Sequence, residues 1–219
     1  MNQSFAVIGL GRFGMALAIK LASEGKEVIG IDMDEERVKE FRDYSDYAYV
    51  ATSMSKKVLQ EIGVQDCDVA IVCMGSQLET SILTTLNVIH LGVKEVIARA
   101  TNEAHGEILE KLGAQVVYPE KDMALRLANR LIRKHLVDFI SLDSGIDISE
   151  IVVGNRMIGH SLIDLRVREK YHINIVGLIQ KNKVTIDIDP NYQFQQDDKV
   201  VLIGTTKYID KFINHYSGN

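Results

Sequence analysis

The stretch most able to do chemistry is GLGRFG at 9–14, which follows a short apolar run and opens a segment of helical periodicity. A G-x-G-x-x-G turn between a strand and a helix is typical of dinucleotide-binding domains. Gly9 permits the tight turn, Gly11 lets a pyrophosphate approach the backbone, and Gly14 lets the helix lie close to the sheet. Because the start of a helix offers free N–H groups, the stretch predicts a phosphate-binding loop.

Two charged residues indicate which nucleotide the loop takes. Asp32 ends the second apolar run, where a carboxylate accepts hydrogen bonds from ribose hydroxyls and repels a 2′-phosphate. Arg12 places a guanidinium beside the phosphates and pairs well with a terminal one, which favours ATP or ADP over NAD. An arginine exposed on a loop with no ligand is the alternative interpretation of Arg12.

Further candidate residues lie at the ends of the predicted strands, because ligands of doubly wound sheets bind outside their carboxyl ends. The predicted nucleotide contacts, besides those above, are Phe13, Met33, Thr52, Ser53, Met74, Gly75 and Arg99, with Ser76 beside them. Arg99 is expected to reach a phosphate, although an arginine at a strand end is as often part of a surface ion pair.

No pattern of a catalytic site is recognisable. None of the six histidines belongs to a catalytic motif, and HExxH, GxSxG and Walker lysine motifs are absent. Cys67 and Cys73 form no CxxC pair, so we expect two reduced thiols. The prediction is a protein that is not an enzyme, with a small NAD-dependent oxidoreductase as the alternative.

Charge argues against nucleic acid as a partner. The formal net charge is −5, and no helix-turn-helix pattern or basic tail accompanies it. We therefore expect no nucleic acid polymer to bind, and a redox-sensing transcription regulator is disfavoured. No apolar run is long enough to cross a bilayer, and the start of the chain does not resemble a signal peptide.

The elements that position these residues alternate over the first half of the chain. Apolar runs predict strands, and 3.6-residue periodicity predicts helices between them. The predicted strands are 5–8, 27–31, 47–50, 68–73, 96–98 and 116–118, and the helices are 13–23, 34–44, 55–62, 78–91 and 104–112. All of these helices except 34–44 end at a glycine. The fold class is α/β, a doubly wound parallel sheet of the Rossmann type.

The pattern changes after Pro119. A helix is predicted over 123–136, with an apolar stripe at Ala124, Leu127, Ala128 and Leu131. The stripe fits burial in its own core and packing against a partner subunit equally well. Strands over 137–142, 146–153, 173–180, 183–188 and 199–203 and a helix over 208–215 predict a small α+β lobe.

Four stretches together resemble one family over the whole length. They are VIGLGRFG (7–14), SILTTL (81–86), EKLGAQVVYPEKDMA (110–124) and LRVREKYHINIVG (165–177). The chain resembles the cytosolic RCK-type regulatory subunits of Ktr/Trk potassium transporters, the KtrA/KtrC family. The resemblance implies a nucleotide-binding RCK_N lobe over 1–120, a crossover helix for dimerisation over 121–137 and an RCK_C ligand-binding lobe over 138–219.

The resemblance also implies roles for single residues. Arg12 matches an arginine that reaches a terminal phosphate in the neighbouring subunit. Glu120 matches a nucleotide-site glutamate that holds a divalent cation, Mg²⁺ or Ca²⁺, at a dimer interface, and an acid that interacts with the dipole at a helix start is its alternative interpretation. Arg99 stands where close relatives carry lysine and Thr52 where many carry aspartate, so both contacts are less secure.

Partners follow from the same resemblance. The second lobe is expected to bind cyclic di-AMP through Ile163, Leu165, Arg168, Asn174, Ile175 and Pro190. The family implies homodimers that form an octameric ring, docked in the cytoplasm on a KtrB-type membrane subunit that translocates potassium.

Overall fold

The computed structural model describes residues 3–75, 77–132, 136–142, 145–181 and 183–216. The chain divides into two compact units, Met1–Asp122 and Met123–Asn219. Among the described residues, no helix is long and apolar enough to cross a membrane. Ser76 and residues 133–135, which belong to the helix predicted over 123–136, lie outside the described residues.

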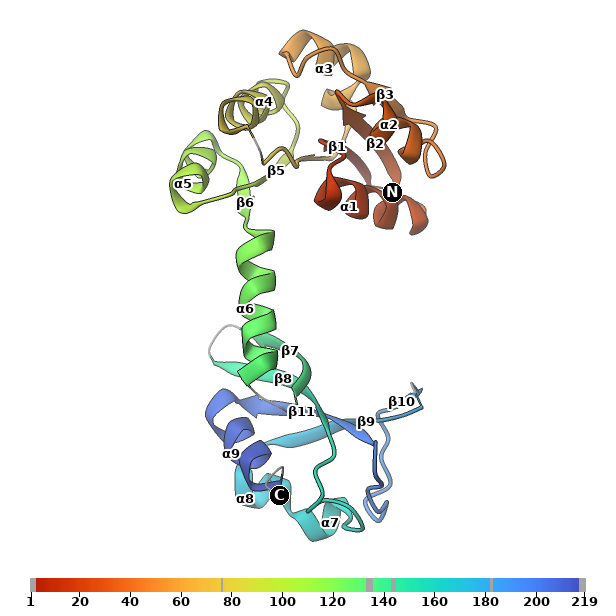
Figure 1. Cartoon of the computed structure of the whole chain (residues 1–219), viewed down its shortest axis with the longest axis vertical. Helices are drawn as coiled ribbons and strands as arrows, with labels where there is room; N and C mark the ends of the chain where they lie inside the picture. Colours follow the sequence, from red (N-terminus) through yellow and green to blue (C-terminus); the bar gives the residue numbers. More distant parts are fainter. Residues whose placement is uncertain (1–2, 76, 133–135, 143–144, 182, 217–219) are drawn as a thin grey trace. The chain divides into compact units, whose positions relative to one another are not determined.

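The first unit is a six-stranded parallel sheet with the strand order β3-β2-β1-β4-β5-β6 (Figure 1). Its strands are β1 (Ser4–Ile8), β2 (Glu27–Asp32), β3 (Ala48–Val50), β4 (Val69–Val72), β5 (Glu95–Arg99) and β6 (Gln115–Val117). The connecting helices are α1 (Arg12–Ser23), α2 (Glu35–Phe41), α3 (Lys56–Ile62), the 3-10 turn η1 (Val64–Asp66), α4 (Leu78–His90) and α5 (Glu103–Leu112). The predicted doubly wound sheet is confirmed, with the order reversing between β1 and β4.

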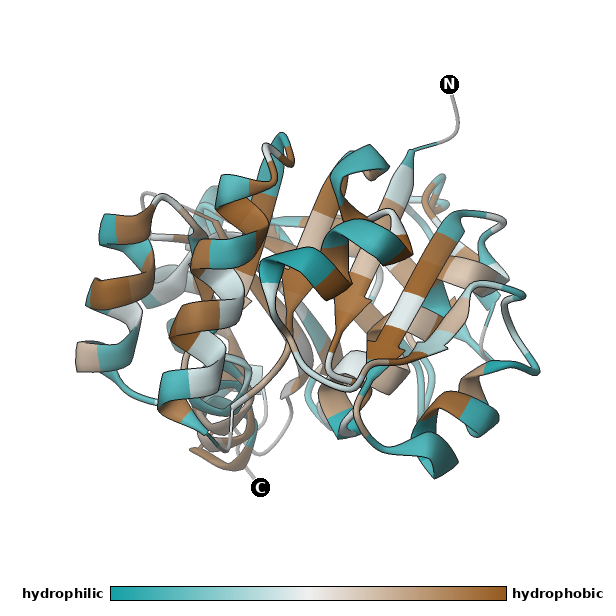
Figure 2. Ribbon diagram, turned by 90° about the horizontal axis from the view of Figure 1, so that it is seen from above, coloured by the Kyte–Doolittle hydropathy of each residue, from teal (hydrophilic) through white to brown (hydrophobic). Residues whose placement is uncertain are grey.

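Helices cover both faces of this sheet, because successive strand residues point to opposite sides. Ala6 and Ile8 of β1 belong to the core cluster that includes Leu59, Val88 and Leu109 of α3, α4 and α5. Val7, the residue between them, belongs to the cluster on the α1 and α2 side. The helices accordingly alternate between hydrophobic and hydrophilic residues along their length (Figure 2).

Local signals at the helix ends explain where most helices begin and end. Asp34, Ser55 and Asn102 each accept a hydrogen bond from a backbone N–H in the first turn of the helix they precede. Gly63 and Gly113 end α3 and α5 in the left-handed conformation, with φ of 95° and 102°. The prediction for 34–44 was too long, since α2 starts after its cap and ends at Phe41.

The helix predicted over 123–136 was displaced. Helix α6 covers Pro119–Ile132, and Leu136 already belongs to strand β7 (Leu136–Leu142). Proline fits the first turn of a helix, where its missing N–H is not needed. The negative charges of Glu120 and Asp122 in that turn stabilise the helix by interacting with the positive end of its dipole. Leu136 instead pairs with Ile151 of the neighbouring strand.

The second unit is a five-stranded antiparallel sheet with the order β10-β9-β11-β8-β7 (Figure 1). The other strands are β8 (Ile146–Val152), β9 (Asn174–Gln180), β10 (Lys183–Thr185) and β11 (Lys199–Thr205), and the helices are α7 (Leu162–Leu165), α8 (Val167–Tyr171) and α9 (Thr206–Tyr216). The predicted α+β lobe is confirmed. Periodicity missed α7 and α8 because they are too short to repeat an apolar face, and β10 is shorter than predicted.

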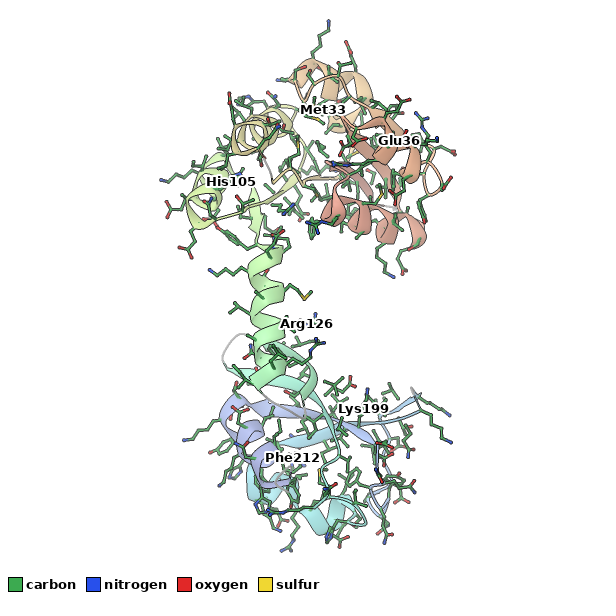
Figure 3. The ribbon with its side chains drawn as sticks, viewed as in Figure 1. Met33, Glu36, His105, Arg126, Lys199 and Phe212 are labelled. Atoms are coloured by element: carbon green, nitrogen blue, oxygen red, sulfur yellow. The ribbon has the colours of Figure 1, made fainter. Side chains whose placement is uncertain are left out.

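Alternate residues of β8 and β11 form the core of this unit together with α9. Ile151, Val200 and Leu202 are buried beside Phe212, which is fully enclosed. Figure 3 labels Phe212 on α9, and Lys199, which begins β11 and pairs with Glu150 of β8 at 3.0 Å. The apolar side of the sheet therefore holds α9 in place.

The glycine loop provides a test of this packing. A Cβ at Gly14 would lie 1.9 Å from the Gly9 carbonyl oxygen, whereas a Cβ at Gly11 would meet nothing within 4 Å. We expect Gly14→Ala to lower the free energy of unfolding by about 1–3 kcal/mol, as overpacking does. Gly11→Ala is the matched control and should stay within about 0.5 kcal/mol of the wild type. Denaturant titration measures both, and equal stabilities of the two variants would contradict this account.

Candidate nucleotide-binding site

A groove of about 890 Å³ lies at the carboxyl ends of the central strands of the first unit. Eight of the predicted residues line it, namely Gly9, Gly11, Arg12, Asp32, Met33, Met74, Gly75 and Arg99. Other lining residues were not predicted, among them Arg37, Met54, Cys73 and Gln77. The groove spans the point where the strand order reverses, which is where doubly wound sheets bind their ligands.

The three glycines of the loop meet different demands. Gly9 has φ of +98°, in the region that glycine alone adopts readily, and its N–H donates to the Ile31 carbonyl at 2.7 Å. Glycine is required at position 14 because a Cβ there would collide with the Gly9 carbonyl oxygen. Gly11 has an ordinary φ of −68° and open space where a side chain would be. No described residue therefore explains the glycine at position 11.

The start of α1 presents donors to the groove. Gly11 is the N-cap and supplies no side-chain acceptor, and the first turn contains no acidic residue. Arg12 is exposed, lines the groove and makes no ion pair with any residue that the structure describes. The N–H groups, the helix dipole and this guanidinium all favour an anion at the same place.

Asp32 is buried, with 6% of its surface exposed, and both of its carboxylate oxygens are hydrogen-bonded. Its Oδ2 accepts from the Leu10 N–H at 2.6 Å, and its Oδ1 from the Asp34 N–H at 2.9 Å. An Arg37 nitrogen lies 3.5 Å from Oδ2. Since each carboxylate oxygen accepts more than one bond, Asp32 fixes the glycine loop and keeps capacity for ribose hydroxyls.

Arg37 is the main residue that the sequence analysis missed on this side of the groove. It stands five residues after Asp32, on α2, and also pairs with Asp34 at 3.4 Å. A basic residue one helical turn beyond the acidic end of the second strand is the signal that would have identified it. Figure 3 labels Met33 and Glu36 in this part of the unit.

The opposite end of the groove carries Arg99. Its guanidinium packs on Gly75, where an added Cβ would lie 3.0 Å from the guanidinium carbon. An Nη atom of Arg99 forms an ion pair with Glu120, and its Nε is buried with no partner among the described residues. Arg99 therefore forms an ion pair in this structure and also lines the groove, where its guanidinium can contact a phosphate.

The predicted cation site does not fit the residues of one chain. Magnesium and calcium take six or more oxygen ligands. The described residues contain no cluster of three or more histidine, cysteine or acidic side chains able to hold a metal. Glu120 offers a single carboxylate, which Arg99 already engages. We therefore derive no step through a metal ion.

Some predicted residues do not line the groove. Phe13 packs against the core on the α1 side. Thr52 and Ser53 are exposed after β3, where Met54 lines the groove instead, and Ser53 Oγ donates to Ser55 Oγ at 3.2 Å. Side-chain direction after a strand depends on the path of the loop, which periodicity does not determine.

The side chains that line the groove include no histidine and one cysteine. Burial raises the pKa of the Cys73 thiol to about 12, so it is no thiolate nucleophile at neutral pH. His105 is buried in the α5 region, where burial lowers its pKa and the Thr101 N–H lies 3.4 Å from its Nδ1 (Figure 3). The Cys73 and His105 side chains are both buried in the first unit.

A second groove, of about 450 Å³, lies in the second unit. The predicted residues Ile163, Arg168, Asn174 and Ile175 line it, together with Leu162, Arg166, Val167, Glu169 and Ile173. Leu165 is buried in the core, and the Pro190 carbonyl accepts a hydrogen bond from the Ile163 N–H at 3.3 Å. Four of the six predicted residues thus line the groove, and Leu165 and Pro190 do not.

Residues of the short helices α7 and α8 line this second groove. Ser161 and Asp164 form a capping box, in which Asp164 Oδ2 accepts from Ser161 Oγ at 2.6 Å and from its N–H at 2.8 Å. Arg166, at φ 48°, turns the chain between α7 and α8. The turn brings Arg166 and Arg168 to the same groove, beside apolar Ile163.

Helix α6 has no buried residue among those described. Leu131 and Ile132 are 71% and 77% exposed. A smaller groove of about 380 Å³ is lined by residues of α6 and β7, namely Met123, Arg126, Leu127, Arg130, Val137 and Phe139. Figure 3 labels Arg126 on α6. The interpretation of the stripe as buried in its own core is therefore wrong for the single chain.

Comparison with known proteins agrees with this architecture. The TrkA-N domain matches residues 5–119, and the TrkA-C domain matches residues 148–216. The Ktr system potassium uptake protein C of Bacillus subtilis (strain 168) is 37% identical over 213 residues, which cover 97% of this chain and 96% of that protein.

Solved structures share the fold. The RCK domain of GsuK covers all of this chain with a TM-score of 0.53 and 23% identity, and this chain spans 47% of that one. A structure described as GsuK bound to ADP covers 61% of this chain and is itself covered to 35%, with a TM-score of 0.51 and 29% identity. Because both domains match in order and one relative matches over nearly its whole length, the chain belongs to the RCK-domain family of Ktr system potassium uptake proteins.

Proposed function

We propose that this chain is a regulatory subunit that gates a potassium transporter by binding adenine nucleotide in its first unit. One observation carries the nucleotide assignment: at Gly11 and Arg12, bare backbone and a guanidinium without a described ion-pair partner face one groove. Asp32 at the same groove supplies the acceptor for ribose. The relatives named as potassium uptake proteins support the regulatory role.

ADP and ATP are the ligands that the groove fits best. The Asp32 carboxylate disfavours a 2′-phosphate, and Arg12 and Arg99 offer charge to phosphates beyond the first. The 29% identical structure described as bound to ADP supports this choice. NAD is the alternative ligand, because its pyrophosphate makes the same demands on the glycine loop.

The proposed role is binding without chemical conversion. A hydride-transfer enzyme needs a general acid or base beside its cofactor. The groove offers no histidine, and its thiol is held protonated by burial. A small NAD-dependent oxidoreductase is the alternative, and NADH oxidation monitored by absorbance with candidate substrates tests it.

The second groove is proposed to bind cyclic di-AMP. Arg168 supplies charge for a phosphate, Asn174 supplies amide hydrogen bonds, and Ile163 and Ile175 offer apolar surface for adenine. The match to the TrkA-C domain supports the assignment.

Assembly is proposed to start at α6. Its exposed leucines would pack against the same helix of a second chain, giving homodimers that form an octameric ring. The ring would lie in the cytoplasm, docked on a KtrB-type subunit in the membrane.

Gating follows from differential affinity. A ligand shifts an equilibrium between two ring conformations only by the difference in its affinities for them. ATP and ADP differ in the charge that they bring to Arg12 and Arg99, so they can favour different conformations. Cyclic di-AMP in the second unit would bias the same equilibrium toward low transport.

The nucleotide assignment predicts the effect of removing Arg12. Arg12→Gln should weaken binding of ATP and ADP by about 10- to 100-fold, the range for a hydrogen bond to a charged group. Isothermal titration calorimetry measures the affinity, and ATP-stimulated potassium flux with the membrane subunit should fall. Arg42→Gln removes an exposed arginine outside the groove and should bind normally. Unchanged affinity of the Arg12 variant would refute its role.

The cyclic di-AMP assignment predicts a similar loss in the second unit. Arg168→Gln should weaken cyclic di-AMP binding by about 10-fold or more. Lys170→Gln, an exposed change on the same helix and outside the groove, is the control. If both variants bind as the wild type does in calorimetry, the assignment is wrong.

The assembly proposal predicts dissociation on charging the helix surface. Leu131→Glu places a carboxylate on a side chain that is 71% exposed in the single chain. Buried unpaired charge is costly, so the assembled fraction at micromolar concentration should drop in analytical ultracentrifugation. Ile186→Glu, at a position 81% exposed on another segment, should leave assembly intact. Equal behaviour of the two variants would exclude α6 as the interface.

A further inference from the structure

The ion pair between Arg99 and Glu120 joins the nucleotide groove to the first turn of α6. Arg99 ends β5 and lines the groove, whereas Glu120 is the second residue of α6. The side chain of Arg99 is 21% exposed and that of Glu120 is 63% exposed. The arginine is therefore held in the groove wall, and the carboxylate reaches it from outside.

The sheet order indicates which part of a nucleotide would meet Arg99. Asp32 ends β2, the glycine loop follows β1, Gly75 follows β4 and Arg99 ends β5, and these strands are consecutive in the order β2-β1-β4-β5. Neighbouring strands lie about 4.8 Å apart, so Arg99 stands about 10 Å beyond the strand that carries the glycine loop. With the ribose at Asp32 and the first phosphate at the loop, further phosphates extend toward Gly75 and Arg99.

Arg99 has more hydrogen-bonding capacity than its present partner uses. A guanidinium carries five N–H donors in a fixed fork. Its Nε is buried beside the groove without a partner among the described residues. A phosphate arriving at Gly75 meets the two Nη atoms of Arg99, which would lie 3.0 and 3.2 Å from a Cβ at that glycine, and competes with the Glu120 carboxylate for the guanidinium.

We propose that Glu120 is an internal competitor that sets how strongly the groove prefers nucleotides with more than one phosphate. This inference rests on the proposed function, since it takes ADP and ATP as the ligands. A second or third phosphate draws Arg99 away from Glu120, whereas AMP leaves the pair in place. The groove thereby discriminates by phosphate number.

The competition also acts on α6. Two other contacts fix the start of this helix to the first unit: Lys121 pairs with Glu103 at 3.1 Å, and the Tyr118 hydroxyl packs against Gly106. Neither contact reaches the groove. The Arg99–Glu120 pair is thus the contact at the start of α6 that nucleotide phosphates can break.

The test measures binding of AMP, ADP and ATP to the full-length protein by calorimetry, in buffer with EDTA so that no divalent cation contributes. Glu120→Gln should bind ADP and ATP about two- to fivefold more tightly, the range that exposed ion pairs contribute, and AMP unchanged. Glu103→Gln removes an acid that pairs with the neighbouring Lys121 and is the matched control, with no expected change.

A double-mutant cycle separates competition from simple repulsion. Arg99→Gln should reduce the preference for ADP over AMP, and adding Glu120→Gln to it should have no further effect. Arg99→Lys, which keeps the charge, should retain part of the preference and guards against loss of folding, checked by thermal unfolding.

The outcomes distinguish this inference from the proposed function. If the wild type binds none of the three nucleotides, the proposed function itself fails. If the wild type binds ADP but Glu120→Gln binds it equally, the competition alone is refuted. Tighter binding by Glu103→Gln as well, or by Glu120→Gln in the Arg99→Gln background, would show a general effect of charge and overturn the proposal.

Discussion

The candidate site depends on one buried hydrogen bond, from the Leu10 N–H to the Asp32 carboxylate. A carboxylate with 6% of its surface exposed is costly unless it is hydrogen-bonded, and here backbone N–H groups on both sides satisfy it. The bond fixes the glycine turn against the end of β2. The start of α1, and with it Gly11 and Arg12, is positioned by that turn. The same carboxylate thus organises the glycine loop and keeps acceptor capacity for a ribose.

The two ends of the groove are electrostatically different. At the β2 end, Arg37 lies close to the acids Asp32 and Asp34, so the local charges largely balance. Near α1 and β5, Arg12 and Arg99 bring two guanidinium groups, of which only Arg99 has a described acid partner. A nucleotide has the complementary polarity, with a neutral nucleoside at one end and phosphates at the other. This asymmetry would orient the proposed nucleotide in the groove.

The groove of the second unit is formed by different elements from those of the first. Its ligand groove is built on two short helices joined by a residue in the left-handed conformation, and an antiparallel sheet with a helix on its apolar side supplies stability. Several of the residues proposed to contact cyclic di-AMP therefore lie on a segment whose shape depends on caps and turns. In the sequence, α6 lies between the residues of the two grooves. Its leucines are exposed and are not buried in the core of the single chain. Such a surface is typical of a chain that assembles.

The sequence by itself determined the alternation of elements and the glycine loop, because apolar periodicity and glycine are local properties. These signals correctly predicted the parallel sheet and the helix ends at Gly63 and Gly113. They also predicted that Asp32 and Arg12 lie at the groove beside the glycine loop. The start of α6 at Pro119 also has a local signal, a proline followed by the acids Glu120 and Asp122. The prediction followed the apolar stripe instead and therefore placed the helix too far along the chain.

Tertiary structure alone decided which side chains meet. The placement of Met54 in the groove instead of Thr52 and Ser53, the approach of Arg37 to Asp32, and the pairing of Arg99 with Glu120 join residues that periodicity treats as independent. Helices α7 and α8 were missed because helices this short are specified by a capping box and by packing. Contacts between distant segments depend on the path of loops and the order of strands, and neither is a property of any one stretch of sequence.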